Sequence, residues 1–384
     1  MKSYVKISKK VLDWVIQQTE NANLSSEAKE LLAKWVSEEK KPTFNQVEKI
    51  SRTTGIPLGY FFLDTPPVEN LTIVEYRTVD SLELSNPSRN LIETLKNMEF
   101  IQDWTHTYLS DSISNLAYVG AMKNHDNIEE FANYIRYVLN LEKNWNVLCS
   151  STREAFKTLR NSISDAGTIV MLSGIVGNNT RRVLNIKEFR AFALVDKIAP
   201  LIFINNNDSD NGKLFSLVHE FAHICIGINS LYNDNNQADS TYRKTEKICN
   251  AVAAEILLPT DNFLSDWNTC SYDPKEKIAR ISKKYCCSEV VTARKAVDNH
   301  LISKPLYHQI VSQIYITLDQ KRENKSRSGG DFYQTQVSRL DRNFLMYLSG
   351  SVATGNTKYT DAFAMTNTNR KTYGTLMERI GTIQ

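Results

Sequence analysis

The sequence predicts an α+β fold, a mostly helical, multi-domain chain built around one small sheet. Three observations support this prediction. Apolar residues recur at helical spacing through most of the chain, short runs rich in Ile, Val and Phe are confined to residues 167–206, and 384 residues with 41% apolar content suffice for two or three cores. We expect regions at 1–70, 71–160, 161–270, 271–320 and 321–384.

The first region, residues 1–70, reads as short helices. VLDWVIQQTE and SSEAKELLAKWVSEE have helical apolar spacing, and a third helix begins near Thr43 and ends at Gly55. A Pro-Pro pair then marks the boundary. Helical spacing returns from residue 90, so we expect a helical linker region over 71–160.

The strand-like runs are GTIVMLSGIVG, KEFRAFALVD and PLIFINN, separated by Gly, Asn, Asp and Pro. They predict a small sheet at the start of the region 161–270. Two interpretations of PLIFINN, residues 200–206, stay open. It is either an edge strand that binds an extended substrate, with Phe203 and Asn205 in contact with it, or a purely structural strand.

The segments after the sheet are helical again. A polar loop leads into the apolar helix FSLVHEFAHICIG, a second polar loop, SLYNDNNQAD, follows, and the next helix ends at Pro259. Two helices around a tight turn at 286–288 are expected within 271–320. Residues 321–331 have the composition of a flexible linker, and the remainder of 321–384 reads as a basic helical tail.

The net charge of +3 is unevenly distributed. Residues 273–384 carry 18 Lys and Arg against 10 Asp and Glu, whereas residues 1–272 carry 28 against 33. A basic third of a chain is typical of a protein that binds DNA or an acidic partner, although a solvated surface gives the same surplus. Both interpretations stay open.

No run reaches the eighteen apolar residues of a membrane span, and the first twenty residues are too polar for a secretory signal. We therefore expect a cytoplasmic protein with no membrane partner. The six cysteines form no CxxC pair, which favours reduced thiols.

The helix FSLVHEFAHICIG carries the candidate chemistry. His219 and His223 are four residues apart, so both imidazoles lie on one helix face and can bind the same metal ion. Glu220 lies about 100° further around the helix, where it can act as a catalytic base on a water molecule. The alternative is a helix with two structural histidines and a surface glutamate.

A catalytic zinc site needs a third protein ligand and one open position. Glu246, on the following helix, is the candidate, and Asn250 one turn later is expected to hydrogen-bond a ligand histidine. Bound Zn²⁺ lowers the pKa of water to about 7, so this set predicts hydrolysis of a peptide bond.

The run from about residue 160 to 259 resembles the ImmA/IrrE family of bacterial zinc metallopeptidases. The resemblance is carried by APLIFIN, FSLVHEFAH and EKICNAVAAEILLP, in which Glu246 occupies the place of the family's Glu ligand. It implies a zincin-like core of the gluzincin type, with Zn²⁺ as the cofactor and zinc metallo-endopeptidase activity.

The flanking segments also resemble parts found with this family. KKPTFNQVEKISRTTGIPLGYFFLDTPPVE is similar to the end of an Xre-type helix-turn-helix domain, VEYR to the joining segment, and IARISKKYCCSEVVTARKAV to the helical pair that follows the peptidase. Because NANLSSEAKELLAKW is short for a full two-helix DNA-reading unit, we expect a degenerate domain over 1–70.

The resemblance also implies a biological role. Relatives cut helix-turn-helix repressors to release stress or mobile-element genes, and fused forms occur in toxin–antitoxin gene pairs. We therefore expect a site-specific endopeptidase that cleaves a regulatory protein encoded nearby. The alternative is an antitoxin or transcriptional regulator that uses an inactive or secondary peptidase fold to bind a toxin partner or DNA.

Overall fold

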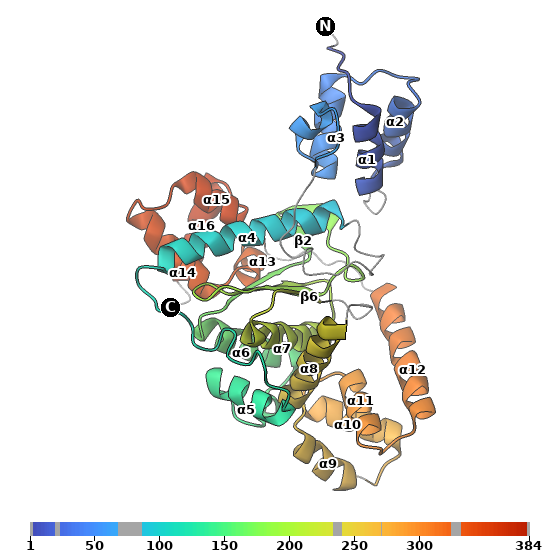
Figure 1. Ribbon diagram of the computed structural model, residues 1–384, viewed down its shortest axis with the longest axis vertical. Helices are drawn as coiled ribbons and strands as arrows, with labels where there is room; N and C mark the ends of the chain where they lie inside the picture. Colours follow the sequence, from blue (N-terminus) through green and yellow to red (C-terminus); the bar gives the residue numbers. More distant parts are fainter. Residues whose placement is uncertain are drawn as a thin grey trace.

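The structure is a computed structural model that describes residues 3–19, 24–67, 87–232, 240–269, 271–323 and 332–381. It contains many helices and a small mixed sheet, which is consistent with the predicted α+β class. A small helical unit stands at the amino end, and the sheet lies at the centre between two layers of helices (Figure 1). VEYR and most of the expected linker at 321–331 lie outside the described residues.

The central sheet has four strands in the order β1-β5-β4-β6. β1 runs parallel to β5, whereas β4 is antiparallel to both β5 and β6. β2 and β3 form a separate antiparallel ribbon. The strands are β1 (Ile169–Ser173), β2 (Ile175–Val176), β3 (Asn179–Val183), β4 (Ala191–Leu194), β5 (Leu201–Asn205) and β6 (Ser230–Tyr232).

Side chains alternate between the two faces of this sheet, as the two-residue period of a strand requires. Leu172 and Ile204 belong to the hydrophobic cluster on the side of α7, whereas Met171 and Phe203 belong to the cluster on the side of α4. We call these sides the α7 face and the α4 face. Because both faces are buried, β4 is apolar at every position, and β5 is apolar up to its last residue, Asn205.

On the α7 face, α6 and α7 lie directly on the sheet, and the other helices of the same hydrophobic cluster lie further out (Figure 1). The two helices expected around a tight turn at 286–288 are present, and Cys286 in the turn has φ of +48°. The elements are α5 (Ile128–Val138), η4 (Trp145–Leu148), α6 (Thr152–Asp165), α7 (Asp210–Ile226), α8 (Ser240–Leu257), α9 (Thr260–Thr269), α10 (Pro274–Lys284), α11 (Glu289–Asp298) and α12 (Lys304–Glu323).

The α4 face is covered by one early helix and the carboxy-terminal helices. These are α4 (Arg89–Leu109), α13 (Phe332–Arg339), α14 (Arg342–Ala353), α15 (Tyr359–Thr366) and α16 (Arg370–Gly381). The segments that the sequence presents as a linker, 71–160, and as a tail, 321–384, therefore both contribute described helices to the cores on the sheet.

The free side of β1 is occupied by the junction between α13 and α14. The Val170 backbone N–H donates to the Asp341 carboxylate at 3.1 Å, and Asp341 also caps α14 by accepting from two backbone N–H groups. Arg160 donates to the carbonyls of Val170 and Leu340, each at 2.8 Å. These bonds attach the carboxy-terminal helices to the sheet.

The amino-terminal unit has its own core around Trp35. A capping box between Thr43 and Gln46 begins its third helix, and Gly55 ends it with φ of +73°. Its elements are α1 (Lys9–Thr19), α2 (Ser26–Val36), α3 (Phe44–Thr54) and η1 (Leu58–Phe62).

Among the described residues, no helix combines the length and the apolar character that crossing a membrane requires. The five described cysteines are all free thiols, and four of them are buried.

Candidate metal centre

The helix α7 presents the site from inside the α7 face. Ser209 begins it by accepting a hydrogen bond from the Gly212 N–H at 3.0 Å, and Gly227 ends it in the left-handed conformation at φ of +83°. The apolar residues between these caps anchor the helix against β4 and β5, so His219 and His223 have no exposed surface.

The structure brings His219, His223 and Glu246 together. The two histidine Nε2 atoms are 3.2 Å apart. Glu246 reaches across from α8, with one carboxylate oxygen 3.2 Å from His219 Nε2 and the other 3.0 Å from His223 Nε2. All three side chains can offer a ligand atom within the same small volume.

This arrangement fits a tetrahedral zinc ion. Zinc bonds of about 2.0–2.1 Å to nitrogen and oxygen place neighbouring ligand atoms roughly 3.3 Å apart in a tetrahedron. The three separations, between 3.0 and 3.2 Å, are close to that value. Two imidazoles and one carboxylate also leave the fourth position open, as a catalytic site requires.

The pKa values of Glu246 and His223 are both shifted in favour of the charged form. Burial disfavours the carboxylate of Glu246, but the two histidines outweigh it and hold the pKa of Glu246 below its ordinary value. Burial also disfavours the imidazolium of His223, yet Cys249 and Glu246 outweigh it and raise the pKa of His223. The site is therefore arranged for a cation among these groups.

Glu220 is fully buried beside this cluster. Its Oε2 accepts a hydrogen bond from the Ser230 hydroxyl, while its Oε1 makes no hydrogen bond among the described residues. Burial raises the pKa of Glu220, and the neighbouring histidines partly offset this effect. One oxygen is held in place, and the other remains available to accept a proton.

The sequence did not indicate Ser230. It opens the run SLYNDNNQAD, which reads as a polar loop, but Ser230–Tyr232 forms the strand β6 beside β4. The pair Leu231 and Tyr232 after the serine was the feature of the sequence that could have indicated a strand. The rest of that run, 233–239, lies outside the described residues.

The side chain of α8 that lies beside His223 belongs to Cys249, the residue before the expected Asn250. Cys249 is fully buried on α8, and together with Glu246 it raises the pKa of His223, while the Nδ1 atom of His223 makes no hydrogen bond among the described residues. The Asn250 side chain is half-buried and makes no hydrogen bond to either histidine among the described residues. A helix places consecutive residues about 100° apart, so only one of the two can face His223.

The interpretation of PLIFINN as an edge strand is wrong, because β5 is paired with β1 on one side and β4 on the other. Phe203 packs on the α4 face, where its ring stacks on Phe192 at 5.0 Å, away from the metal centre. Asn205 is fully buried and donates to the Phe189 carbonyl. The side chains of both residues therefore contact other parts of the protein, and neither is placed to bind a substrate.

Comparison with known proteins finds a family match in the central part of the chain. Residues 178–296 match a peptidase family described as the IrrE N-terminal-like domain, and this span contains α7, α8 and β6. Residues 340–379 match a domain of unknown function. No curated protein matches the chain. The first match supports the ImmA/IrrE family for this domain and indicates a metallopeptidase type of function.

Proposed function

We propose that this chain is a zinc-dependent endopeptidase with a zincin-like catalytic core. The convergence of His219, His223 and Glu246 at tetrahedral ligand spacing is the observation that carries the proposal. These three side chains would hold Zn²⁺, leaving one position for water or substrate.

Bound zinc would supply Lewis acidity, which lowers the pKa of a water molecule to about 7 and polarises a carbonyl group. Glu220 accepts the proton of the attacking water and returns it to the leaving amine. Its burial among apolar residues excludes competing solvent, and the Ser230 hydroxyl fixes the orientation of its carboxylate.

The substrate is proposed to add as a strand to β6. This strand pairs with β4 on one side, and no other described strand pairs with it. Ser230 lies on β6 and touches Glu220, so a peptide that ran alongside β6 would pass the catalytic base. The strand β1 cannot bind a peptide in this way, because its Val170 N–H already donates a hydrogen bond to the Asp341 carboxylate.

The substrate is proposed to be a cytoplasmic regulatory protein encoded nearby, in particular a helix-turn-helix repressor. Support comes from the resemblance of the segments around the peptidase domain and from the separate amino-terminal helical unit, which offers a second binding surface. Selection by such a surface protects other proteins from cleavage.

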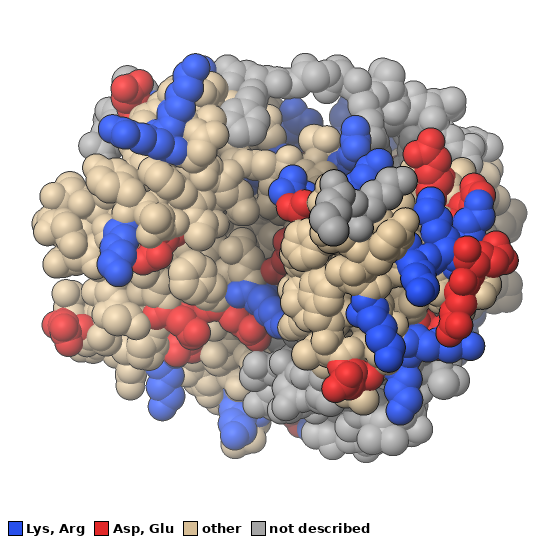
Figure 2. All heavy atoms as spheres, turned by 90° about the horizontal axis from the view of Figure 1, so that it is seen from above, with Lys and Arg blue, Asp and Glu red and all other residues tan. Residues whose placement is uncertain are grey.

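The second candidate is an antitoxin or transcriptional regulator whose peptidase fold binds a partner or DNA. The surplus of Lys and Arg in residues 273–384 favours it. However, on the face seen in Figure 2, basic and acidic side chains are interspersed and do not form one basic area. Phosphate binding depends on a concentrated positive surface, so this face gives DNA binding little support.

The substitution Glu220→Gln tests the proposal, because the amide keeps the shape of the side chain but cannot accept a proton. We expect zinc content to stay at about one ion per chain while cleavage of proteins encoded nearby falls by about 10²- to 10⁴-fold. The matched control is Glu276→Gln on α10, far from the centre in sequence and partly exposed. Metal analysis and electrophoresis give the two readouts.

Full cellular function in the Glu220→Gln variant would favour the regulator over the enzyme. Loss of zinc from this variant would instead show that the residue is needed for the metal site, and the proton-transfer role would then have no support.

A further inference from the structure

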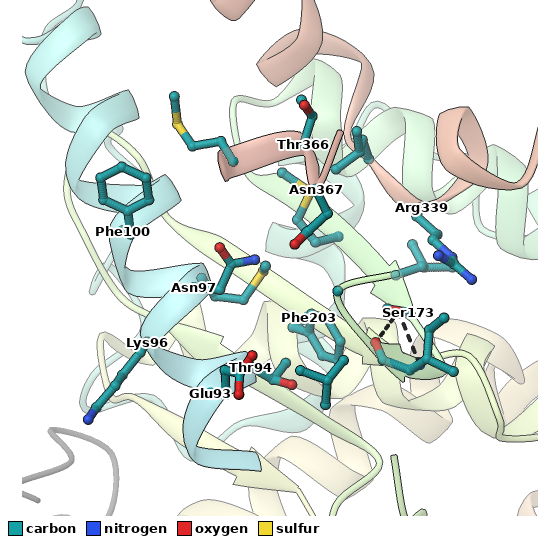
Figure 3. A pocket seen from close by; sticks show the side chains of 18 of the residues that line it. Glu93, Thr94, Lys96, Asn97, Phe100, Ser173, Phe203, Arg339, Thr366 and Asn367 are labelled. Carbon is teal, nitrogen blue, oxygen red and sulfur yellow. Dashed lines mark hydrogen bonds between the residues drawn. The ribbon is translucent and has the colours of Figure 1, made fainter. Parts of the chain in front are cut away.

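A cavity of about 330 Å³ lies on the α4 face, on the opposite side of the sheet from the metal centre. Its floor comes from β1, the β2 turn and β5, its wall from α4, and its roof from α13 and α15 (Figure 3). Part of the roof belongs to the region 340–379, which matches only a domain of unknown function. The volume is in the range of small-molecule sites.

The inner lining is apolar and adaptable. Met98, Met171 and Met365, three of the seven methionines in the chain, are buried around the cavity with Phe203. Methionine side chains adjust to irregular shapes, and their sulfur atoms make favourable contacts with aromatic rings. This lining suits a flat aromatic body.

The polar side chains of the lining divide into paired and available groups. The Ser173 hydroxyl donates to the Ile175 carbonyl, the Thr366 hydroxyl donates to the Ala362 carbonyl, and Glu93 pairs with Arg182 at 2.7 Å. These groups have no remaining need for a ligand.

Two amides are different. The side chains of Asn97 on α4 and Asn367 at the end of α15 make no hydrogen bond among the described residues, and Figure 3 shows them directed toward one another across the cavity. A Cβ at Gly177 would lie 3.0 Å from Asn367 Oδ1, so the glycine leaves room for this amide. Both can donate to and accept from a bound molecule.

Arg339, the last residue of α13, supplies a cation at the lining. Its Nη1 donates to Asn178 Oδ1 and Gln336 Oε1, each at 3.2 Å, and both partners are neutral. No carboxylate of the described residues forms an ion pair with it, and burial lowers the pKa of this guanidinium. A half-buried cation with only neutral partners is stabilised by an anion.

We propose that this cavity binds a small organic anion with a flat aromatic body. The body would lie between the methionines and Phe203, the two asparagine amides would bind its polar edge, and Arg339 would pair with its acidic group. Such a ligand would contact both the sheet and the carboxy-terminal helices, and its site would be separate from the peptidase centre.

The test uses the full chain and two fluorescent probes that share a ring system. Anilinonaphthalene sulfonate carries an anionic group, whereas phenylnaphthylamine is neutral. We expect the anionic probe to bind saturably at about one site per chain and at least tenfold more tightly than the neutral probe, because only the anionic probe can form a charged hydrogen bond with Arg339.

Three variants locate the site. Arg339→Gln should weaken the anionic probe about tenfold, Arg339→Lys should restore part of the affinity, and Asn97→Trp should fill the cavity and abolish binding. Asn97 has no hydrogen bond to lose, so its replacement should leave the fold intact. Arg342→Gln is the matched control, since Arg342 pairs with Asp165 at the exposed surface.

The proposal is overturned if the anionic probe binds without saturation, or equally well to the native chain and Asn97→Trp. Equal affinity for the two probes, or no effect of Arg339→Gln in a chain with native circular dichroism, would overturn the anionic character of the ligand.

Discussion

The two faces of the central sheet are both buried, but they are assembled differently. On the α7 face, the proposed metal ligands and the proposed catalytic glutamate come from one stretch, residues 210–250, and they meet through two neighbouring helices. On the α4 face, the cavity collects side chains from α4, the sheet, α13 and α15. A local motif builds the first site, and long-range packing builds the second.

The largest expected effect is the loss of bound zinc when one of the proposed ligands on the α7 face is replaced. His219→Ala or Glu246→Ala should reduce zinc from about one ion per chain to almost none, because two ligands do not complete a catalytic set. Metal analysis after dialysis is the measurement, and His308→Ala on α12 is the control. Full zinc occupancy in the Glu246 variant would identify a different third ligand.

The α4 face should dominate the stability of the sheet. Phe192 is fully buried and stacks on Phe203, so Phe192→Ala should lower the free energy of unfolding by about 3–5 kcal/mol. Urea unfolding measures this change. The half-exposed Phe44, replaced by Ala in a control, should cost much less. Equal losses would show that the aromatic stack contributes little.

A smaller effect should follow from releasing Glu220. Ser230→Ala removes the hydroxyl that donates to Glu220 Oε2, and a hydrogen bond to a charged group contributes about 1.5–3 kcal/mol. We expect turnover to fall by about tenfold while zinc content is unchanged. The control is Ser265→Ala on the exposed side of α9. An unchanged rate would show that the hydrogen bond from Ser230 is not needed to orient the Glu220 carboxylate.

The smallest effect distinguishes Cys249 from Asn250. Cys249→Ala removes the thiol that contacts His223, so zinc affinity should fall by less than about tenfold, since a thiol is a weak donor. Asn250→Ala should change it less. Competition with a fluorescent chelator measures both. A larger loss for Asn250→Ala would favour the hydrogen bond that the sequence suggested.

The sequence predicted what depends on local spacing. The four-residue interval between His219 and His223, and the position of Glu246 on the next helix, determine the ligand cluster almost completely. Strand pairing could not be predicted in this way. PLIFINN and Ser230 each read plausibly as something else, because the order β1-β5-β4-β6 depends on contacts between distant segments.

The carboxy-terminal helices show the same limit. Their surplus of Lys and Arg suggested a separate tail, yet Phe344 and Leu376 are fully buried in the cluster on the α4 face. Charge counts describe the exposed side of a helix, whereas the apolar spacing of its other side determines where it packs.

The carboxylate of Asp341 has a consequence for solubility. By accepting from the Val170 N–H, it occupies the side of β1 on which no other described strand pairs. An exposed apolar strand edge is a template for pairing between molecules, so a chain shortened before α13 should self-associate. Nucleic-acid binding by the basic segment is therefore better examined with charge-neutralising substitutions on exposed positions than by truncation, and fusion partners are best attached at the amino end.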